Sequence, residues 1–130
     1  MKKYNIGILG ATGAVGKQMI EVLQEYNFPI NELHLLASSR SKGKEVVVNG
    51  QYFVLGAASN DVAKQFKDAI LKANAVFIDN SSAFRMDDNV PLVVPEINGD
   101  DVFKHQGIIS NPNCSTIITL VAINDRRFTT

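Results

Sequence analysis

The sequence predicts an α/β fold with a mostly parallel, doubly wound sheet, and three observations carry that prediction. Short apolar runs of strand length recur along the chain, segments with helical apolar spacing separate several of them, and a glycine-rich turn joins the first run to the first helix. Strands that alternate with helices form βαβ units, whose parallel strands are buried on both faces. At 130 residues, the chain suffices for one such domain and is short for two.

The first 37 residues form the first βαβ unit. Residues 4–9 are a β-type run, residues 10–16 (GATGAVG) turn the chain into a helix that Phe28 and Pro29 close, and residues 33–37 predict a buried second strand. The apolar stripe of the helix is expected at Val15, Met19, Val22 and Tyr26.

The next elements alternate in the same way. Residues 44–48 are β-rich and meet a hairpin signal at Asn49 and Gly50, before an apolar run at 52–55. Ser59 or Asn60 caps a helix whose stripe is expected at Val62, Phe66, Ala69 and Ala73.

The elements expected in the last third of the chain are shorter than those before them. Residues 75–79 predict a strand, and a polar stretch at 80–91 leads to the apolar residues 92–94. A short helix at 100–104, a strand at 107–109, a turn at 110–114 and a helical segment at 115–123 complete the prediction.

The glycine turn at 10–16 predicts a dinucleotide site. Its spacing is G-x-x-G-x-x-G instead of G-x-G-x-x-G, but it follows a strand and opens a helix, whose first amides can hold a pyrophosphate. An NAD site usually has an acidic residue after the second strand, whereas this chain has Ser38, Arg40 and Ser41 there. A guanidinium beside hydroxyls suits the 2′-phosphate of NADP. The alternatives are a purely structural turn and a solvated loop charge at Arg40.

Cys114 is the one cysteine, and it lies in the motif NPNCST at residues 111–116. A thiol at a helix start is favoured as thiolate and has backbone donors nearby, so Cys114 is a candidate nucleophile for aldehyde oxidation with a nicotinamide. The alternative is a small core residue. Arg85 follows a strand's carboxyl end and is a candidate anion ligand, with a surface ion pair as the alternative.

Other features exclude function classes. Thirteen basic and thirteen acidic residues leave no field for nucleic acid or an anionic membrane, and no apolar run approaches membrane-spanning length. A cytoplasmic protein without a metal site is therefore expected. His34 and His105 have no partner that the sequence can identify, and the paired aspartates at 87–88 and 100–101 are expected to be loop and helix-start charges.

Five motifs in order resemble aspartate-semialdehyde dehydrogenases: GATGAVG, SRS at 39–41, DNSSAFRM at 79–86, VPLVVPEIN at 90–98, and NPNCST. The resemblance implies a Rossmann-like fold, NADP, and reductive dephosphorylation of aspartyl 4-phosphate for lysine, threonine and methionine synthesis. It implies small-molecule partners and a homo-oligomer. The cofactor residues implied are Gly10, Thr12, Gly13, Ala14, Val15, Gly16, Ser38, Arg40 and Ser41. Cys114 is the implied nucleophile, with Asn113 beside it, and Arg85 the implied phosphate or substrate ligand.

Two departures from the family lead to further expectations. The first is a segment that the family has between Gly50 and Tyr52 and that this chain lacks. The second is the sequence after Asn124, which is unlike the family. We expect residues 1–124 to be the NADP-binding domain, 125–130 a divergent tail, and the substrate and dimerisation domain to be absent. Little turnover by this chain is therefore expected. The alternatives are a catalytically silent NADP-binding fragment, an N-acetylglutamyl-phosphate type reductase, and a fragment that dimerises through uncovered strands.

Overall fold

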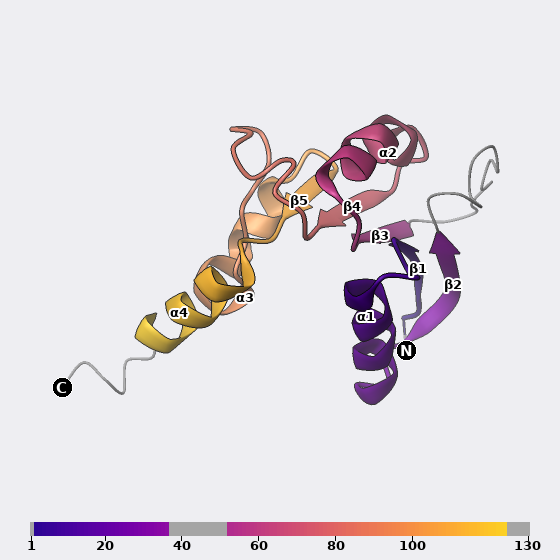
Figure 1. Cartoon of the computed structure of the whole chain (residues 1–130), viewed down its shortest axis with the longest axis horizontal. Coiled ribbons are helices and arrows are strands. Elements are labelled where there is room, and N and C mark those ends of the chain that lie inside the picture. Colours follow the sequence, from indigo (N-terminus) through magenta and orange to yellow (C-terminus); the bar gives the residue numbers. More distant parts are fainter. Residues whose placement is uncertain (1, 37–51, 125–130) are drawn as a thin grey trace.

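The computed structural model describes residues 2–36 and 52–124 of the chain. Its five strands form one parallel sheet in the order β2-β1-β3-β4-β5, which confirms the α/β prediction (Figure 1). The elements are β1 (Tyr4–Leu9), α1 (Ala14–Glu25), β2 (Ile30–Leu36), β3 (Tyr52–Gly56), α2 (Asn60–Lys72), β4 (Val76–Asp79), α3 (Pro95–Asn98), the 3-10 helix η1 (Gly99–Lys104), β5 (Ile108–Ser110) and α4 (Cys114–Asn124).

The strand order reverses direction at β1. The chain runs from β1 to β2 on one side, and β3 then pairs with the other side of β1. In open parallel sheets, ligands bind beyond the carboxyl ends of the strands at such a reversal. The topology therefore places the expected binding position beside the turn that follows β1.

Helices α1 and α2 cover opposite faces of the sheet (Figure 1). Ile6 and Ile8 of β1 pack on the α1 side, while Val54 and Phe77 pack on the α2 side. The alternation along each strand creates both faces, since successive side chains point to opposite sides.

The predicted apolar stripes of both helices are partly wrong. Val15, Val22 and Tyr26 are 47%, 41% and 79% exposed; of the predicted residues Met19 packs against the sheet, together with Ile20 and Leu23. The reason is Gly16, which is buried against the backbone of the preceding turn and so fixes which side of α1 faces the sheet. In α2, the buried residues are Ala63 and Ile70, whereas the predicted Ala69 and Ala73 are exposed.

Several element boundaries also differ from the sequence prediction. Strand β2 begins at Ile30 instead of residue 33, and helix α4 begins at Cys114, which the prediction left in a turn. Residues 92–94 form only an isolated bridge, from Leu92 to Ser110, and the unpredicted helix α3 follows them. The expected strand at 44–48 and hairpin at 49–50 lie outside the described residues.

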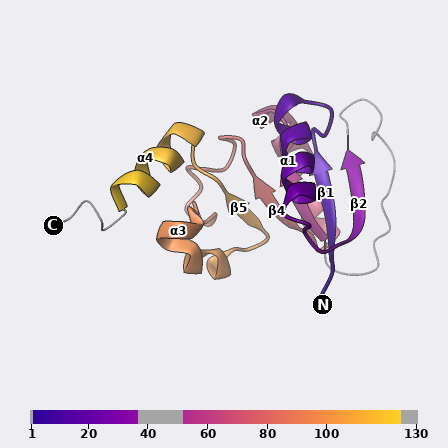
Figure 2. The ribbon, with the colours of Figure 1, turned by 90° about the horizontal axis from the view of Figure 1, so that it is seen from below.

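Helix α4 leads away from the sheet beyond α3 and β5 (Figures 1 and 2). Its Ile118 and Ile123 are 71% and 67% exposed, although the helix is strongly apolar. None of the helices in the ranges 2–36 and 52–124 is both long and apolar enough to cross a membrane.

Candidate functional site

Four turns lie side by side at the carboxyl edge of the sheet. Each is tied to the next by a backbone hydrogen bond in which the amide donates: Ala57 to Leu9 (2.8 Å), Asn80 to Gly56 (3.1 Å) and Asn111 to Asp79 (2.9 Å). These bonds continue the parallel pairing past the strand ends. The turns that follow β1, β3, β4 and β5 therefore form one continuous edge.

The turn after β1 requires glycine at two positions. Gly10 has a φ of +86°, and a Cβ there would lie 2.7 Å from the carbonyl oxygen of Ala57. A Cβ on Gly16 would lie 2.7 Å from the Cα of Ala11. The glycines thus allow the turn, the neighbouring loop and the start of α1 to approach one another closely.

The start of α1 is free to receive an anion. Gly13 is the N-cap residue and supplies no side-chain cap, and the first turn holds no acidic residue. Residues 12–15 are exposed; the Gly13 amide donates to the Gly10 carbonyl oxygen at 3.0 Å, and the amides of Ala14 and Val15 at the helix start have no side-chain cap. Backbone donors and the helix dipole together suit a phosphate group. Gly10, Thr12, Gly13, Ala14, Val15 and Gly16 therefore fit the phosphates of a dinucleotide, whereas Ser38, Arg40 and Ser41 lie outside the described residues.

Arg85 connects the loop after β4 to the loop after β5. Its Nε donates to the carbonyl oxygen of Asn111 at 2.8 Å, and its Nη2 donates to that of Asn80 at 3.1 Å. A guanidinium has five N–H donors, so these two bonds fix its plane and leave donors for an anion. The structure thus holds Arg85 against Asn111, which comes two residues before Asn113 in the β5 loop.

Asp79 organises the loop that carries Arg85, and sequence reasoning gave it no role. The side chain is fully buried, and its carboxylate accepts hydrogen bonds from the Ser81 amide at 3.2 Å and the Ser81 hydroxyl at 2.6 Å. The Ser81 hydroxyl oxygen in turn accepts from the Ala83 amide at 3.2 Å. An aspartate two residues before a serine at a strand end is typical of such turns, so this signal was available in the sequence.

Helix α2 is attached to the same loop. The Asn60 side-chain amide donates to the Ser82 hydroxyl at 2.8 Å, and the Ser82 backbone amide donates to Asn60 Oδ1 at 3.0 Å. Ser59, one of the two predicted positions, is the N-cap residue, but it makes no side-chain cap bond, and Asn60 uses its side chain on Ser82.

Cys114 is the first residue of α4, and its side chain is exposed. Asn113 caps this helix, because its Oδ1 accepts from the Ser115 amide at 2.9 Å and its carbonyl accepts from the Ile117 amide at 3.0 Å. The thiol therefore stands at a helix start beside an ordered asparagine. Arg85 contacts Asn111 of the same loop, so the structure brings Arg85, Asn113 and Cys114 to one end of the edge.

The glycine turn and Cys114 do not lie together. They follow β1 and β5, which are separated by β3 and β4 in the sheet. Three interstrand spacings of about 4.8 Å separate the two turns by roughly 14 Å. Only an extended ligand could contact both.

The two histidines lie elsewhere. His34 is on β2 and its Nε2 is 3.3 Å from the Glu32 carboxylate. His105 precedes β5, where its Nδ1 accepts from the Gly107 amide at 2.9 Å. Neither contacts Arg85 or Cys114 through a hydrogen bond in the described part of the chain.

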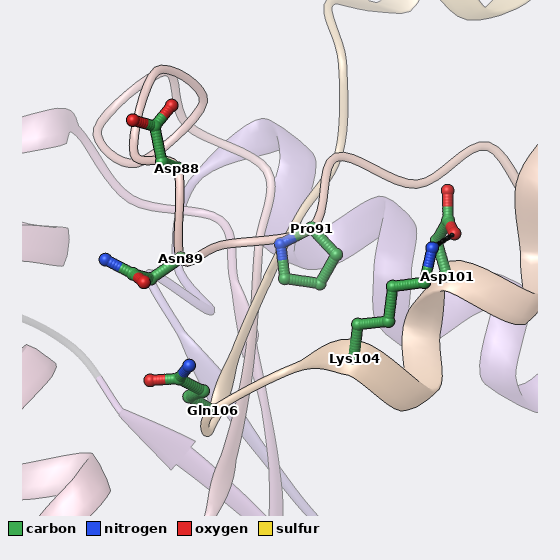
Figure 3. Close-up of a pocket in the computed structure, with 6 residues that line it drawn as sticks. All are labelled: Asp88, Asn89, Pro91, Asp101, Lys104 and Gln106. Carbon is green, nitrogen blue, oxygen red and sulfur yellow. Dashed lines mark hydrogen bonds and ion pairs between the residues drawn. The ribbon is translucent and has the colours of Figure 1, made fainter.

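A shallow polar pocket of about 230 Å³ lies between η1 and the loop before Leu92 (Figure 3). Gln106, just before β5, is one of its lining residues, so the pocket lies toward the amino end of that strand. Asp101 and Lys104, which also line it, form an ion pair at 2.5 Å. No group of three or more metal-ligating side chains occurs among the described residues. This pocket therefore takes no part in the site at the carboxyl edge.

Comparisons with known proteins identify relatives of this chain and of its fold. Residues 5–52 and 47–105 match the family described as semialdehyde dehydrogenase, NAD binding domain. The aspartate-semialdehyde dehydrogenase of Synechocystis is 50% identical over 91% of this chain and 39% of its own length. The structure of aspartate semialdehyde dehydrogenase II from Vibrio cholerae, complexed with ASA, matches with a TM-score of 0.82 and 43% identity, over 94% of this chain and 45% of that one. A Candida albicans aspartate semialdehyde dehydrogenase with NADP shares the fold, with a TM-score of 0.65 and 24% identity over 94% and 46% of the two chains.

The comparisons also show how much of its relatives this chain covers. It spans about two fifths of the curated relatives it matches, for example 39% and 41% of two of them. The alignment with the Synechocystis protein runs over 133 positions but takes in only 91% of 130 residues, so it contains positions that are missing here. The family match divides at residues 47–52, where the sequence predicts a missing segment.

Proposed function

Because the chain belongs to the family of semialdehyde dehydrogenase NAD-binding domains, we propose that it binds NADP along the carboxyl edge of its sheet. We propose further that it is the cofactor-binding and thiol-bearing part of an aspartate-semialdehyde dehydrogenase. One observation carries the proposal: a glycine turn suited to phosphate, an oriented arginine and a helix-start cysteine lie along a single edge. In this proposal residues 1–124 are the NADP-binding domain and 125–130 a divergent tail.

The cofactor would lie with its pyrophosphate at the start of α1. Residues 12–15 are exposed there, the amides of Ala14 and Val15 at the helix start have no side-chain cap, and Gly16 beneath them is buried with no Cβ in the way. Arg40, with Ser38 and Ser41, would bind the 2′-phosphate, because a guanidinium and hydroxyls donate hydrogen bonds to it. The separation of roughly 14 Å along the edge suits a ligand that begins at α1 and ends near Cys114.

The residues near β5 would carry the group-transfer chemistry on aspartyl 4-phosphate. The Cys114 thiolate attacks the acyl carbon, the bond from that carbon to the phosphate oxygen breaks, and phosphate leaves with the electron pair. The product of this step is an acyl-thioester on Cys114. Arg85 binds the phosphate through its unused N–H donors. NADPH, when bound, would supply a hydride to the acyl carbon. The C–S bond then breaks, which releases the Cys114 thiolate and gives aspartate 4-semialdehyde, an intermediate in lysine, threonine and methionine synthesis.

A second candidate is a catalytically silent NADP-binding fragment, and one observation favours it. Neither His34 nor His105 makes a hydrogen bond to the site residues described above, so the described part supplies no histidine as general acid or base at Cys114. General acid–base assistance is worth about 10²–10⁴-fold in rate. We therefore expect this chain alone to show little or no turnover.

Calorimetry tests cofactor binding separately from turnover. We expect the wild-type chain to bind NADP more tightly than NAD, and Arg40→Ala to weaken NADP binding while leaving NAD binding nearly unchanged. Arg126→Ala is the matched charge control. Tighter binding of NAD than NADP by the wild type would refute the 2′-phosphate assignment.

Turnover is tested with aspartate semialdehyde, phosphate and NADP, with Cys114→Ala as background. NADPH formation that depends on Cys114 would support the enzyme and reject the silent fragment. Binding of NADP without such turnover would support the silent fragment.

A further inference from the structure

We propose, on the basis of the function proposed above, that Asp79 is a positioning residue for Arg85. Its carboxylate fixes the course of the loop after β4, and that loop presents the guanidinium to the phosphate group of the substrate. Asp79 is the last residue of β4, and Arg85 follows six residues later. The side chain of Asp79 is fully buried, so it acts through Arg85 and does not touch the ligand.

The sheet has room for this carboxylate because the residues beside it are small. Gly56 is the register partner of Asp79 on β3, and Ser110 is its partner on β5. A Cβ on Gly56 would lie 2.7 Å from Asp79 Oδ1, so the carboxylate occupies the space that a larger residue would fill. Ser110 is fully buried as well. A polar group is thus built into the interior at the end of the sheet, where it needs satisfied hydrogen bonds.

Both carboxylate oxygens of Asp79 are used to shape the loop. Oδ1 accepts from the Ser81 amide at 3.2 Å and Oδ2 from the Ser81 hydroxyl at 2.6 Å, while that hydroxyl oxygen accepts from the amide two residues on at 3.2 Å. Phe84 is buried and packs edge-on against Phe77, with ring centroids 6.1 Å apart. The loop is therefore fixed at both ends, and Arg85 is the next residue.

The acceptors that orient Arg85 are attached directly to Asp79. Arg85 Nη2 donates to the carbonyl oxygen of Asn80, the residue that follows Asp79. Arg85 Nε donates to the carbonyl oxygen of Asn111, whose own amide donates to the Asp79 carbonyl oxygen at 2.9 Å. A shift of the loop at Asp79 would therefore displace both acceptors. The two bonds fix the plane of the guanidinium and leave further N–H donors for a phosphate.

The alternative role for Asp79 is purely structural. Its loss would then lower the stability of the domain but leave the hydrogen bond from Arg85 to Asn111 intact in the molecules that remain folded. A positioning role predicts instead that this bond weakens in the folded protein. The Arg85 Nε–H group reports the difference, because its proton exchanges slowly with solvent only while it is bonded to the Asn111 carbonyl oxygen.

Nuclear magnetic resonance of this Nε–H group, assigned by its loss in Arg85→Lys, tests the orientation. We expect a protected signal in the wild-type chain. Exchange should be about tenfold faster in Asp79→Ala and in Ser81→Ala, because the loss of one hydrogen bond shifts an equilibrium by up to about that factor. Ser81→Thr keeps the hydroxyl and should restore the protection. Ser81→Ala decides the outcome alone if Asp79→Ala does not fold.

Ser110→Ala is the matched control for these variants. Ser110 is as buried as Asp79 and lies beside it on β5, but its hydroxyl has no hydrogen-bond partner in the part of the chain that the structure describes. Removal of that hydroxyl should leave the Arg85 exchange rate unchanged. Wild-type exchange rates in the folded Asp79→Ala and Ser81→Ala variants, or equal acceleration by Ser110→Ala, would overturn the proposal.

Titration with inorganic phosphate, followed by the same signal, tests the consequence for binding. We expect phosphate to shift the wild-type Arg85 signal saturably, and to bind Asp79→Ala and Ser81→Ala about tenfold more weakly. Ser110→Ala should bind it as the wild type does. A wild-type signal that phosphate does not shift would refute the anion role of Arg85 in the proposed function, and the exchange rates would still show whether Asp79 orients the guanidinium. Equal phosphate affinity in variants with faster exchange would overturn the positioning role.

Discussion

Replacing Gly10 with alanine tests whether the turn after β1 needs a glycine for backbone reasons. The φ of +86° costs an L-residue roughly 1–2 kcal/mol. A Cβ would also lie 2.7 Å from the carbonyl oxygen of Ala57, and relief of such a contact in a packed region costs about 1–3 kcal/mol more. The free energy of unfolding should therefore fall by about 2–5 kcal/mol, a large share of the roughly 5–15 kcal/mol of a typical domain.

Gly99→Ala is the matched control for this substitution. Gly99 has helical φ and ψ, and no atom lies within 4 Å of a Cβ added there. Alanine should stabilise this position by about 0.4–1 kcal/mol by restricting the unfolded chain. Urea unfolding followed by circular dichroism measures both variants. If Gly10→Ala unfolds at the same urea concentration as the wild type, the close approach of the β1 and β3 loops is not as the structure shows it.

Three further predictions concern single side chains. Asp79→Ala should lower the free energy of unfolding by about 1–3 kcal/mol, because the Ser81 amide and hydroxyl lose their acceptor. Ser82→Ala, at an exposed position, should lower the free energy of unfolding by less. Equal losses for the two variants in urea unfolding would count against a special role for Asp79. Native protein should react with one equivalent of iodoacetamide at the exposed Cys114, which mass spectrometry detects; an unreactive thiol would show that Cys114 is covered. Burial is the larger cause and the hydrogen bond to the Glu32 carboxylate the smaller one that together raise the pKa of Tyr52 to about 12. The contribution of the protonated Tyr52 hydroxyl to stability is therefore complete below about pH 10 and is lost as the pH rises through the raised pKa. Ultraviolet titration with Tyr52→Phe as reference should show Glu32→Gln lowering this pKa, and an unchanged midpoint would contradict the Glu32 contribution.

Much of the site could be located from the sequence because its signals are local. The strand, glycine turn and helix at residues 4–25 lie within one stretch of chain, and the order of strands and helices then implies a parallel sheet. In such a sheet all carboxyl ends meet at one edge, so Arg85 and Cys114 were expected there with the glycine turn. The cap formed by Asn113 is likewise local, since it bonds a residue two positions on.

Contacts between distant segments could not be predicted in this way. The sequence placed Val15 and Val22 on the buried side of α1, but the face of that helix is decided by the packing of Gly16 on the turn after β1. Arg85 was a candidate anion ligand, but its hydrogen bond to the carbonyl oxygen of Asn111, 26 positions further along the chain, could not be predicted from the local sequence.

The sequence by itself determined the fold class and the position of the glycine turn, and it provided the candidates for the reactive side chains, because periodicity and turn chemistry act over a few residues. The tertiary structure decided which helix faces are buried, how Asp79 and Arg85 hold the loops, and in which order the described strands pair. Those features depend on pairing and packing across the sheet, where the partner of a residue is set by the whole topology and not by its neighbours in the chain.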